Sequence, residues 1–171
     1  MNMSNDIFPV FYVYGYWVVF FGLMANGAGL PVPGEIYLVL GGAAAGSGKL
    51  DFITAILVSV AGAVIGDSIA FYIGRLGGRR LLDLYCKYTL STAKCSEMIT
   101  SFYKRFGVGA IPLTRYIPGI RLLMAPMAGV SRITFSRFFI LDVIGATSWI
   151  VIYLLIGYAF QGIIIDINRN S

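Results

Sequence analysis

Residues 26–45 read NGAGLPVPGEIYLVLGGAAA, an apolar run that is interrupted near its middle. Pro31 and Pro33 each lack an amide donor and clash with a continuing helix, and Gly34 follows them directly. A helical arm of about 11 residues covers only about half of a membrane. The stretch therefore predicts a re-entrant hairpin over residues 26–46, in which two half-length helices meet at the Pro/Gly break and turn back.

The composition of the whole chain shows which solvent surrounds it. Of 171 residues, 58% are hydrophobic and 12% are charged, and the mean hydropathy is +0.81. A soluble domain carries about 25% charged residues. Too few polar side chains remain to cover a water-facing surface, so we expect an all-α, polytopic membrane protein that forms a single domain over residues 1–171.

Three further apolar segments flank the hairpin. Residues 7–25 are long enough to span a membrane, but their Tyr and Trp content also suits an interfacial helix, so both alternatives stay open. Residues 52–74 and 138–165 are predicted transmembrane helices. Residues 75–106 form a basic, amphipathic segment that holds seven of the 13 Lys and Arg residues, and the positive-inside rule places it in the cytoplasm.

A second broken segment covers residues 107–130, where Pro118 and Gly119 interrupt the apolar run. If residues 75–106 are cytoplasmic, the first hairpin enters the membrane from outside and the second enters from the cytoplasm. The N-terminus is then inside and the C-terminus outside, provided that residues 7–25 span. A broken hydrophobic segment at corresponding places in two inverted halves is the best sequence indication of a transporter site.

The residue inventory excludes several classes of membrane enzyme. Histidine is absent, and neither Cys86 nor Cys95 belongs to a CxxC pair or a zinc-ligand pattern. His-dependent lipid phosphatases and HExxH metalloproteases are therefore excluded. We expect no enzyme activity, cofactor, metal or nucleic-acid partner; the partners expected are a lipid substrate and the membrane, and a homo-oligomer is compatible with the sequence.

Three acids fall at or near membrane depth, where a charge costs on the order of 2.5–3.5 kcal/mol. Glu35 directly follows the Pro/Gly break, Asp67 lies within residues 52–74, and Asp142 lies in the first turns of residues 138–165. Each is a candidate proton site or counter-ion. The alternatives are a helix-capping role for Glu35, at a helix N-terminus, and a structural ion pair for Asp67.

Arg115 and Arg121 lie three residues before and three residues after Pro118. Guanidinium groups match phosphate oxygens bidentately, and the free amides around Gly119 add donors, so these residues form a predicted phosphate site. A lipid headgroup is the natural ligand. The alternative is structural: Asp67 and Glu35 neutralise the two arginines and hold the hairpins together.

Several motifs together resemble the DedA family of bacterial membrane proteins, which is related to the VTT-domain (SNARE-associated) proteins of eukaryotes. They cover residues 26–150 in order and include GLPVPGE at 29–35, GD at 66–67, YIGRLGG at 72–78, RYIPGIR at 115–121, and Gly145 with Trp149.

The resemblance implies two re-entrant hairpins that face each other, and transport of undecaprenyl phosphate or phosphatidylethanolamine between leaflets, often dependent on the proton-motive force. Glu35 matches the family's acid after Pro-Gly, and Arg115 and Arg121 match its two functional arginines. Many members carry a further acid where this chain has Ala25-Asn26, which leaves proton coupling to Glu35 and Asp67.

These expectations converge on a multi-pass lipid flippase of the bacterial inner membrane, with undecaprenyl phosphate as the leading substrate and proton coupling left open. Phosphatidylethanolamine is the alternative lipid, since its ammonium group would pair with Glu35. An alternative of another class is a proton-coupled transporter of small solutes or ions, which would use the same charges in a closed cavity.

Overall fold

The computed structural model describes residues 3–89, 109, 111–117, 120–131 and 133–169, and every regular element among them is helical. This agrees with the all-α expectation. The six labelled helices are α1 (Met3–Gly27), α2 (Gly34–Gly46), α3 (Phe52–Thr89), α5 (Ile111–Thr114), α6 (Ile120–Val130) and α7 (Phe135–Arg169).

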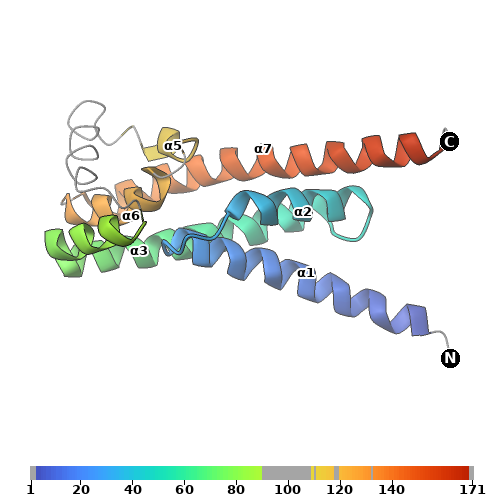
Figure 1. The fold of residues 1–171 in the computed structure, drawn as a ribbon, viewed down its shortest axis with the longest axis horizontal. Coiled ribbons are helices and arrows are strands. Elements are labelled where there is room, and N and C mark those ends of the chain that lie inside the picture. Colours follow the sequence, from blue (N-terminus) through green and yellow to red (C-terminus); the bar gives the residue numbers. More distant parts are fainter. Residues whose placement is uncertain (1–2, 90–108, 110, 118–119, 132, 170–171) are drawn as a thin grey trace.

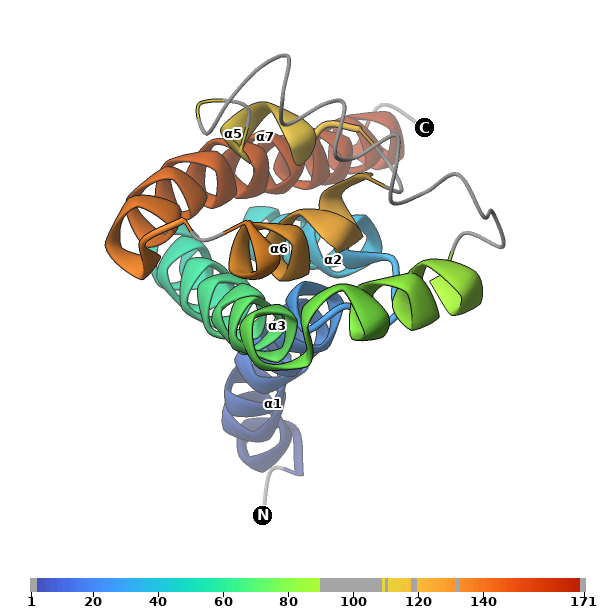
Figure 2. The ribbon, with the colours of Figure 1, turned by 90° about the vertical axis from the view of Figure 1, so that its left-hand side faces the viewer.

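The two long helices α3 and α7 run along the length of the molecule and the shorter helices fill the space between and around them (Figure 1). Helices α1 and α2 extend toward the end that carries both chain termini, whereas α5 and α6 lie toward the opposite end (Figures 1 and 2). The outer ends of α1 and α7 thus share one end of the molecule, whereas the sequence placed the two chain ends on opposite sides on the condition that residues 7–25 span the membrane.

The first Pro/Gly break forms a short connection between α1 and α2. Just after the end of α1, Gly29 has a positive φ of 96°, and the amide of Leu30 donates to the carbonyl of Ala25 at 3.0 Å, which is the Schellman pattern. Pro31 and Pro33 lie in the connection and Gly34 begins α2. The prolines therefore interrupt the helix as predicted.

The arms of this hairpin differ from the prediction. We expected a helix at 7–25 and a separate hairpin at 26–46 with two half-length arms. Instead α1 runs without interruption from Met3 to Gly27 and is itself the first arm. Gly27 continues the helix because it packs against α3, where a Cβ would lie 2.7 Å from the carbonyl oxygen of Ala63.

A polar turn joins α2 to α3. Gly48, with a φ of 73°, lies in the turn after α2, and the amide of Lys49 donates to the carbonyl of Ala44 at 2.9 Å. Asp51 then caps α3, since its Oδ2 accepts hydrogen bonds from the backbone N–H and the hydroxyl of Thr54 at 2.7 and 2.8 Å. This turn lies between the predicted hairpin at 26–46 and the predicted helix at 52–74.

Helix α3 extends beyond its predicted end at Gly74. It continues to a kink at Gly78, where φ is 57° and ψ is −156°, and then to Thr89. Gly74 does not end the helix because it serves packing: a Cβ there would lie 2.1 Å from the carbonyl oxygen of Pro126 on α6. The first part of the predicted segment 75–106 is thus helical, and the remainder lies outside the described residues.

The second broken segment contains the short helix α5 and the longer helix α6. Pro118 and Gly119, the predicted break, lie outside the described residues, and the described chain resumes as α6 at Ile120. Helix α7 begins at Phe135 rather than at residue 138 and extends to Arg169 rather than to 165. The connection before it is therefore shorter than the gap between the predicted segments 107–130 and 138–165.

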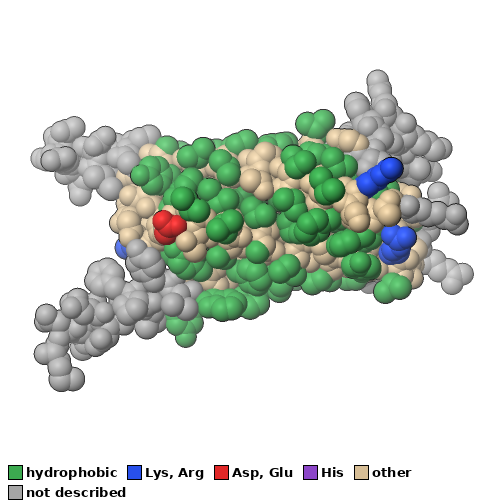
Figure 3. Space-filling view, turned by 180° about the vertical axis from the view of Figure 1, so that it is seen from behind, with side chains coloured by type: hydrophobic (Ala, Val, Ile, Leu, Met, Phe, Trp, Pro, Cys, Tyr) green, Lys and Arg blue, Asp and Glu red, His purple; other side chains and the backbone are tan. Residues whose placement is uncertain are grey.

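The described surface is largely apolar along the molecule. Figure 3 shows hydrophobic side chains over the middle of one face and charged side chains near its two ends. Two stretches are long and apolar enough to cross a membrane, Phe52–Gly78 and Phe135–Gln161, with mean hydropathies of 2.0 and 2.2. Large hydrophobic side chains along both stretches are exposed, among them Leu57, Ile65, Ile144 and Leu155.

Candidate functional site

Arg115 lies in the turn after α5 and reaches acids on both long helices. Its Nη2 donates hydrogen bonds to Oδ2 of Asp67 on α3 and to Oδ1 of Asp142 on α7, the latter at 2.6 Å. The three side chains are only 12%, 11% and 5% exposed, respectively. Breaking such a buried pair by removing one partner costs about 3–5 kcal/mol, so Arg115 ties this turn firmly to α3 and α7.

A glycine on α7 lets the Arg115 turn approach so closely. A Cβ on Gly145 would lie 2.8 Å from the Cα of Pro112 and 3.4 Å from Cδ of Arg115. The turn is also held by Tyr116, whose hydroxyl donates to the Ser148 hydroxyl at 3.0 Å. The backbone of α5 therefore rests directly on α7, which directs the arginine into the interior.

Arg121, in the first turn of α6, pairs with Glu35 in the first turn of α2. Nη1 donates to Oε1 and Nη2 donates to Oε2 at 3.1 Å, so the pair is bidentate. The guanidinium carbon also lies 5.1 Å from the ring centroid of Trp149 on α7, a cation–π distance. Glu35 is 32% exposed, which makes this pair more accessible than the one at Arg115.

Asn26, in the last turn of α1, contacts the connection between α1 and α2. Its side-chain amide donates to the carbonyl of Val32, and the residue is 8% exposed. Its Cγ lies so near Gly34 that a Cβ there would be 3.1 Å away. The sequence marked this position only as a departure from the family pattern, and its polarity inside an apolar run was the signal that indicated a buried role.

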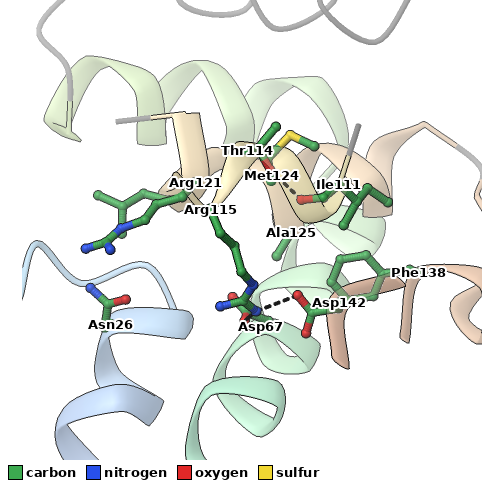
Figure 4. A pocket seen from close by; sticks show the side chains of 11 residues that line it. Asn26, Asp67, Ile111, Thr114, Arg115, Arg121, Met124, Ala125, Phe138 and Asp142 are labelled. Carbon is green, nitrogen blue, oxygen red and sulfur yellow. Dashed lines mark hydrogen bonds and ion pairs between the residues drawn. The ribbon is translucent and has the colours of Figure 1, made fainter. Parts of the chain in front are cut away.

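One pocket connects these groups. It is lined by residues from five helices and the α5–α6 connection: Asn26, Asp67, Ile111, Thr114, Arg115, Arg121, Leu122, Met124, Ala125, Phe138 and Asp142. In Figure 4 the side chain of Arg115 extends toward Asp67 and Asp142, whereas that of Arg121 extends toward the side where Asn26 lies. The two arginines thus line one pocket but hold different acids.

The structure brings five of the predicted site residues together and leaves two undescribed. Arg115, Arg121, Glu35, Asp67 and Asp142 meet around the pocket, whereas Gly119 and Pro118 lie outside the described residues. The ring of Trp149 over Arg121 is an addition that the sequence did not suggest, because Trp149 was noted only as part of a family motif. An anion entering here must compete with carboxylates for guanidinium groups.

Comparison with known proteins assigns the family. The family model of the VTT domain matches residues 32–159, and Protein DedA of Escherichia coli K12 is 28% identical over 86% of this chain and 70% of its own length. The chain is a DedA-family membrane protein. The resemblance of its motifs to this family is thereby confirmed.

Other relatives of this DedA-family protein are also named as membrane proteins or transporters. The uncharacterized membrane protein slr0232 of Synechocystis is 34% identical over 91% of the chain and 71% of its own length. Undecaprenyl phosphate transporter A of Bacillus subtilis is 33% identical over 84% of the chain and 70% of its own length. No solved structure gave a significant match.

Proposed function

We propose that this DedA-family protein moves a phosphate-headgroup lipid between the leaflets of the bacterial inner membrane, with undecaprenyl phosphate as the leading substrate. The name of the Bacillus subtilis relative supports this substrate. Two arginines that line one pocket of an apolar protein carry the proposal. A guanidinium fork matches two phosphate oxygens, and nothing in helix packing alone requires two such groups at this depth.

The depth of the pocket supports a path through the membrane. Asp67 lies near the middle of the apolar stretch Phe52–Gly78, and Gly27, at the end of α1, packs directly against it. We infer that the α1–α2 hairpin and the segment around Pro118 are re-entrant, enter from opposite sides and meet at this level in a multi-pass protein. An ionised phosphate would then find donors where hydrocarbon offers none.

Arg121 is the first contact for the headgroup in this proposal. Its bidentate partner Glu35 is the most exposed of the three acids, so a phosphate replaces that carboxylate with the least rearrangement. Arg115 and the amide of Gly119 then complete the phosphate site, while the prenyl or acyl chain stays in the bilayer. Glu35, once displaced, is left to bind a proton or a cation.

Phosphatidylethanolamine is a second candidate because of Glu35. Its ammonium group would pair with the Glu35 carboxylate while its phosphate binds Arg121. Because Glu35 and Arg121 are hydrogen-bonded to each other, one headgroup can reach both side chains. Undecaprenyl phosphate carries no cation, so its transport does not need the Glu35 carboxylate as a ligand. Glu35→Gln should therefore reduce transport of phosphatidylethanolamine more than transport of undecaprenyl phosphate.

The test is reconstitution of the pure protein in liposomes with each labelled lipid, followed by measurement of transfer between leaflets. Arg121→Gln should slow transfer at least about tenfold, because a hydrogen bond to a charged group contributes about 1.5–3 kcal/mol. Arg121→Lys should recover only part of the rate, since an ammonium group cannot bind bidentately.

Two controls separate transport from folding. Arg137→Gln removes an exposed arginine at the start of α7 and should leave the rate unchanged. The double variant Glu35→Gln/Arg121→Gln removes both charges of the pair, so its thermal midpoint should exceed that of Arg121→Gln while its transport stays low. Transfer of neither lipid by the wild-type protein, or full transfer by Arg121→Gln, would refute the proposal.

A further inference from the structure

The ionisable side chains around the pocket carry unequal charge. Arg115 and Arg121 bring two positive charges, whereas Glu35, Asp67 and Asp142 bring three negative charges. Glu35 pairs with Arg121, which leaves Arg115 alone with two carboxylates. With every acid ionised, the Arg115 cluster therefore holds one excess negative charge.

That excess charge lies in the least solvated part of the site. Asp142 is 4% exposed, and its Oδ1 accepts the hydrogen bond from Arg115 at 2.6 Å. Its other oxygen, Oδ2, is buried and has no hydrogen-bond partner within the described part of the chain. An ionised carboxylate with a buried, unpaired oxygen is costly, because neither water nor a donor replaces its solvation.

No other described pocket group supplies the missing positive charge. From α1, Asn26 donates its amide to a backbone carbonyl, and from the α5 turn, Thr114 donates its hydroxyl to another. From α2, Glu35 adds a further negative charge, and from α6, Arg121 is already engaged by that acid. Helices α3 and α7 present the two aspartates themselves, so a mobile cation must balance the cluster.

We propose that Asp67 and Asp142 together bind one proton, forming a carboxyl–carboxylate pair on Arg115. Two carboxylates that converge on one guanidinium nitrogen hinder each other's ionisation, and a single proton makes the cluster neutral. The proton belongs to the pair rather than to one residue, because closely coupled groups titrate together. Figure 4 shows both acids at the guanidinium end of Arg115.

This proton favours phosphate binding at the same site. A carboxyl group holds a guanidinium group less strongly than a carboxylate does, so a proton on the pair weakens one of the two contacts to Arg115 and removes the excess negative charge that would repel an incoming phosphate. When the proton leaves, both carboxylates pair with Arg115 again and repel the phosphate. Proton and phosphate therefore bind cooperatively, and this step rests on the proposed function, whereas the presence of the proton rests on charge and burial alone.

Infrared spectroscopy of the purified full-length protein tests the proton directly. The wild-type protein at neutral pH should show the carbonyl stretch of a protonated carboxylic acid, identified by its shift in heavy water. Asp142→Asn and Asp67→Asn each leave one carboxylate for one arginine, so each should lose the band. Glu35→Gln, which removes a carboxylate that has an arginine to itself, should retain it.

The outcomes distinguish this inference from the transport proposal. Absence of the band from wild-type protein at neutral pH, or its persistence in both aspartate variants, overturns the proton site, and the wild-type measurement stands even if a variant fails to fold. A missing band together with a thermal midpoint that rises with sodium chloride, but not with choline chloride, overturns it in favour of a sodium ion. A retained band without lipid transfer refutes only the proposed function.

Discussion

At the scale of single residues, the two arginines of the pocket are not equivalent. Arg121 is balanced by one acid and covered by the ring of Trp149, so a phosphate that replaces Glu35 leaves the guanidinium group in place. Arg115 is held between two aspartates from two different helices. Loss of Arg121 should therefore reduce ligand binding more than stability, whereas loss of Arg115 leaves two unpaired acids and destabilises the fold.

Asp51 offers a pH-dependent test at the same scale, outside the apolar stretches. The backbone N–H of Thr54, and then its hydroxyl, hold the pKa of Asp51 below its usual range. Because the pKa is lower in the folded protein, the cap contributes its full stability at pH values above the pKa of the unfolded chain, about 3.9. That stability is lost as the pH falls through the lower pKa of the folded protein.

Asp51→Ala should therefore lower the thermal midpoint in detergent at neutral pH, and the difference from wild type should shrink as the pH falls below about 4. The hydrogen bond from the Asp51 amide to the hydroxyl of Tyr16 at 2.7 Å involves only the backbone of Asp51, so the variant retains it. A difference that stays constant across this pH range would show that the carboxylate does not act as the cap.

At the scale of helices, the sequence predicted the first break but not the lengths of the arms. Pro31 and Pro33 interrupt a helix through covalent chemistry alone, so their effect is visible in the sequence. The predicted helices ended at Ala25 and Gly74, yet α1 continues to Gly27 and α3 passes through Gly74, and both glycines lie where another helix approaches the backbone. Whether a glycine ends a helix or admits a neighbour depends on tertiary packing, which one sequence does not display.

In the candidate site, too, the sequence predicted some features, whereas others depended on tertiary packing. The cost of a charge in a membrane predicted that Arg115, Arg121, Glu35 and Asp67 needed partners or a ligand. The pairing of Arg115 with two acids depends on the approach of α3 and α7 to one turn, so the sequence alone could not predict it. The same holds for the ring of Trp149 over Arg121.

Close packing of helices α1 and α3 leads to a prediction at Gly66. A Cβ there would lie 2.2 Å from the carbonyl oxygen of Met24, which no real contact permits. Alanine favours a helix over glycine by about 1 kcal/mol, but separating the two backbones costs about 1–3 kcal/mol. Gly66→Ala should therefore lower the thermal midpoint in detergent. Gly109→Ala, where a Cβ has no atom of the described residues within 4 Å, is the control, and equal midpoints for the two variants would contradict the packing argument.

At the scale of the whole molecule, the apolar surface should face lipid. Ile65 lies mid-way along the stretch Phe52–Gly78 and is 45% exposed, whereas Leu76 lies near its end and is 88% exposed. A charge at the centre of a span costs about 2.5–3.5 kcal/mol and much less at the interface. Ile65→Lys should therefore reduce the amount of protein inserted in membranes, and Leu76→Lys should not. Equal insertion of both variants would contradict a lipid-facing position for Ile65.

The helices also divide into two groups. Every described glycine whose Cβ would lie within 3.0 Å of another helix's backbone joins α1, α3 and α6 to one another or joins α7 to α2 and α5. Between the groups, side chains make the connection: the buried apolar core that α1 and α3 share with α2 and α7, ring contacts such as Phe71 on Phe138, and the ion pairs of Arg115 and Arg121. Side chains can rearrange where packed backbones cannot, so the boundary between the groups, which passes through the pocket, is the natural place for movement.

Linking the two groups covalently should then block transport. Tyr72 on α3 and Phe135 on α7 have ring centroids 5.1 Å apart, and Tyr72 is 48% exposed. In a protein whose native Cys86 and Cys95 are replaced by serine, the pair Tyr72→Cys/Phe135→Cys can be bridged by a reducible thiol crosslinker. Transfer of labelled lipid should stop after crosslinking and resume after reduction, while each single-cysteine variant should keep its rate under the same treatment. Undiminished transfer by fully crosslinked protein would mean that the headgroup passes without separation of α3 from α7.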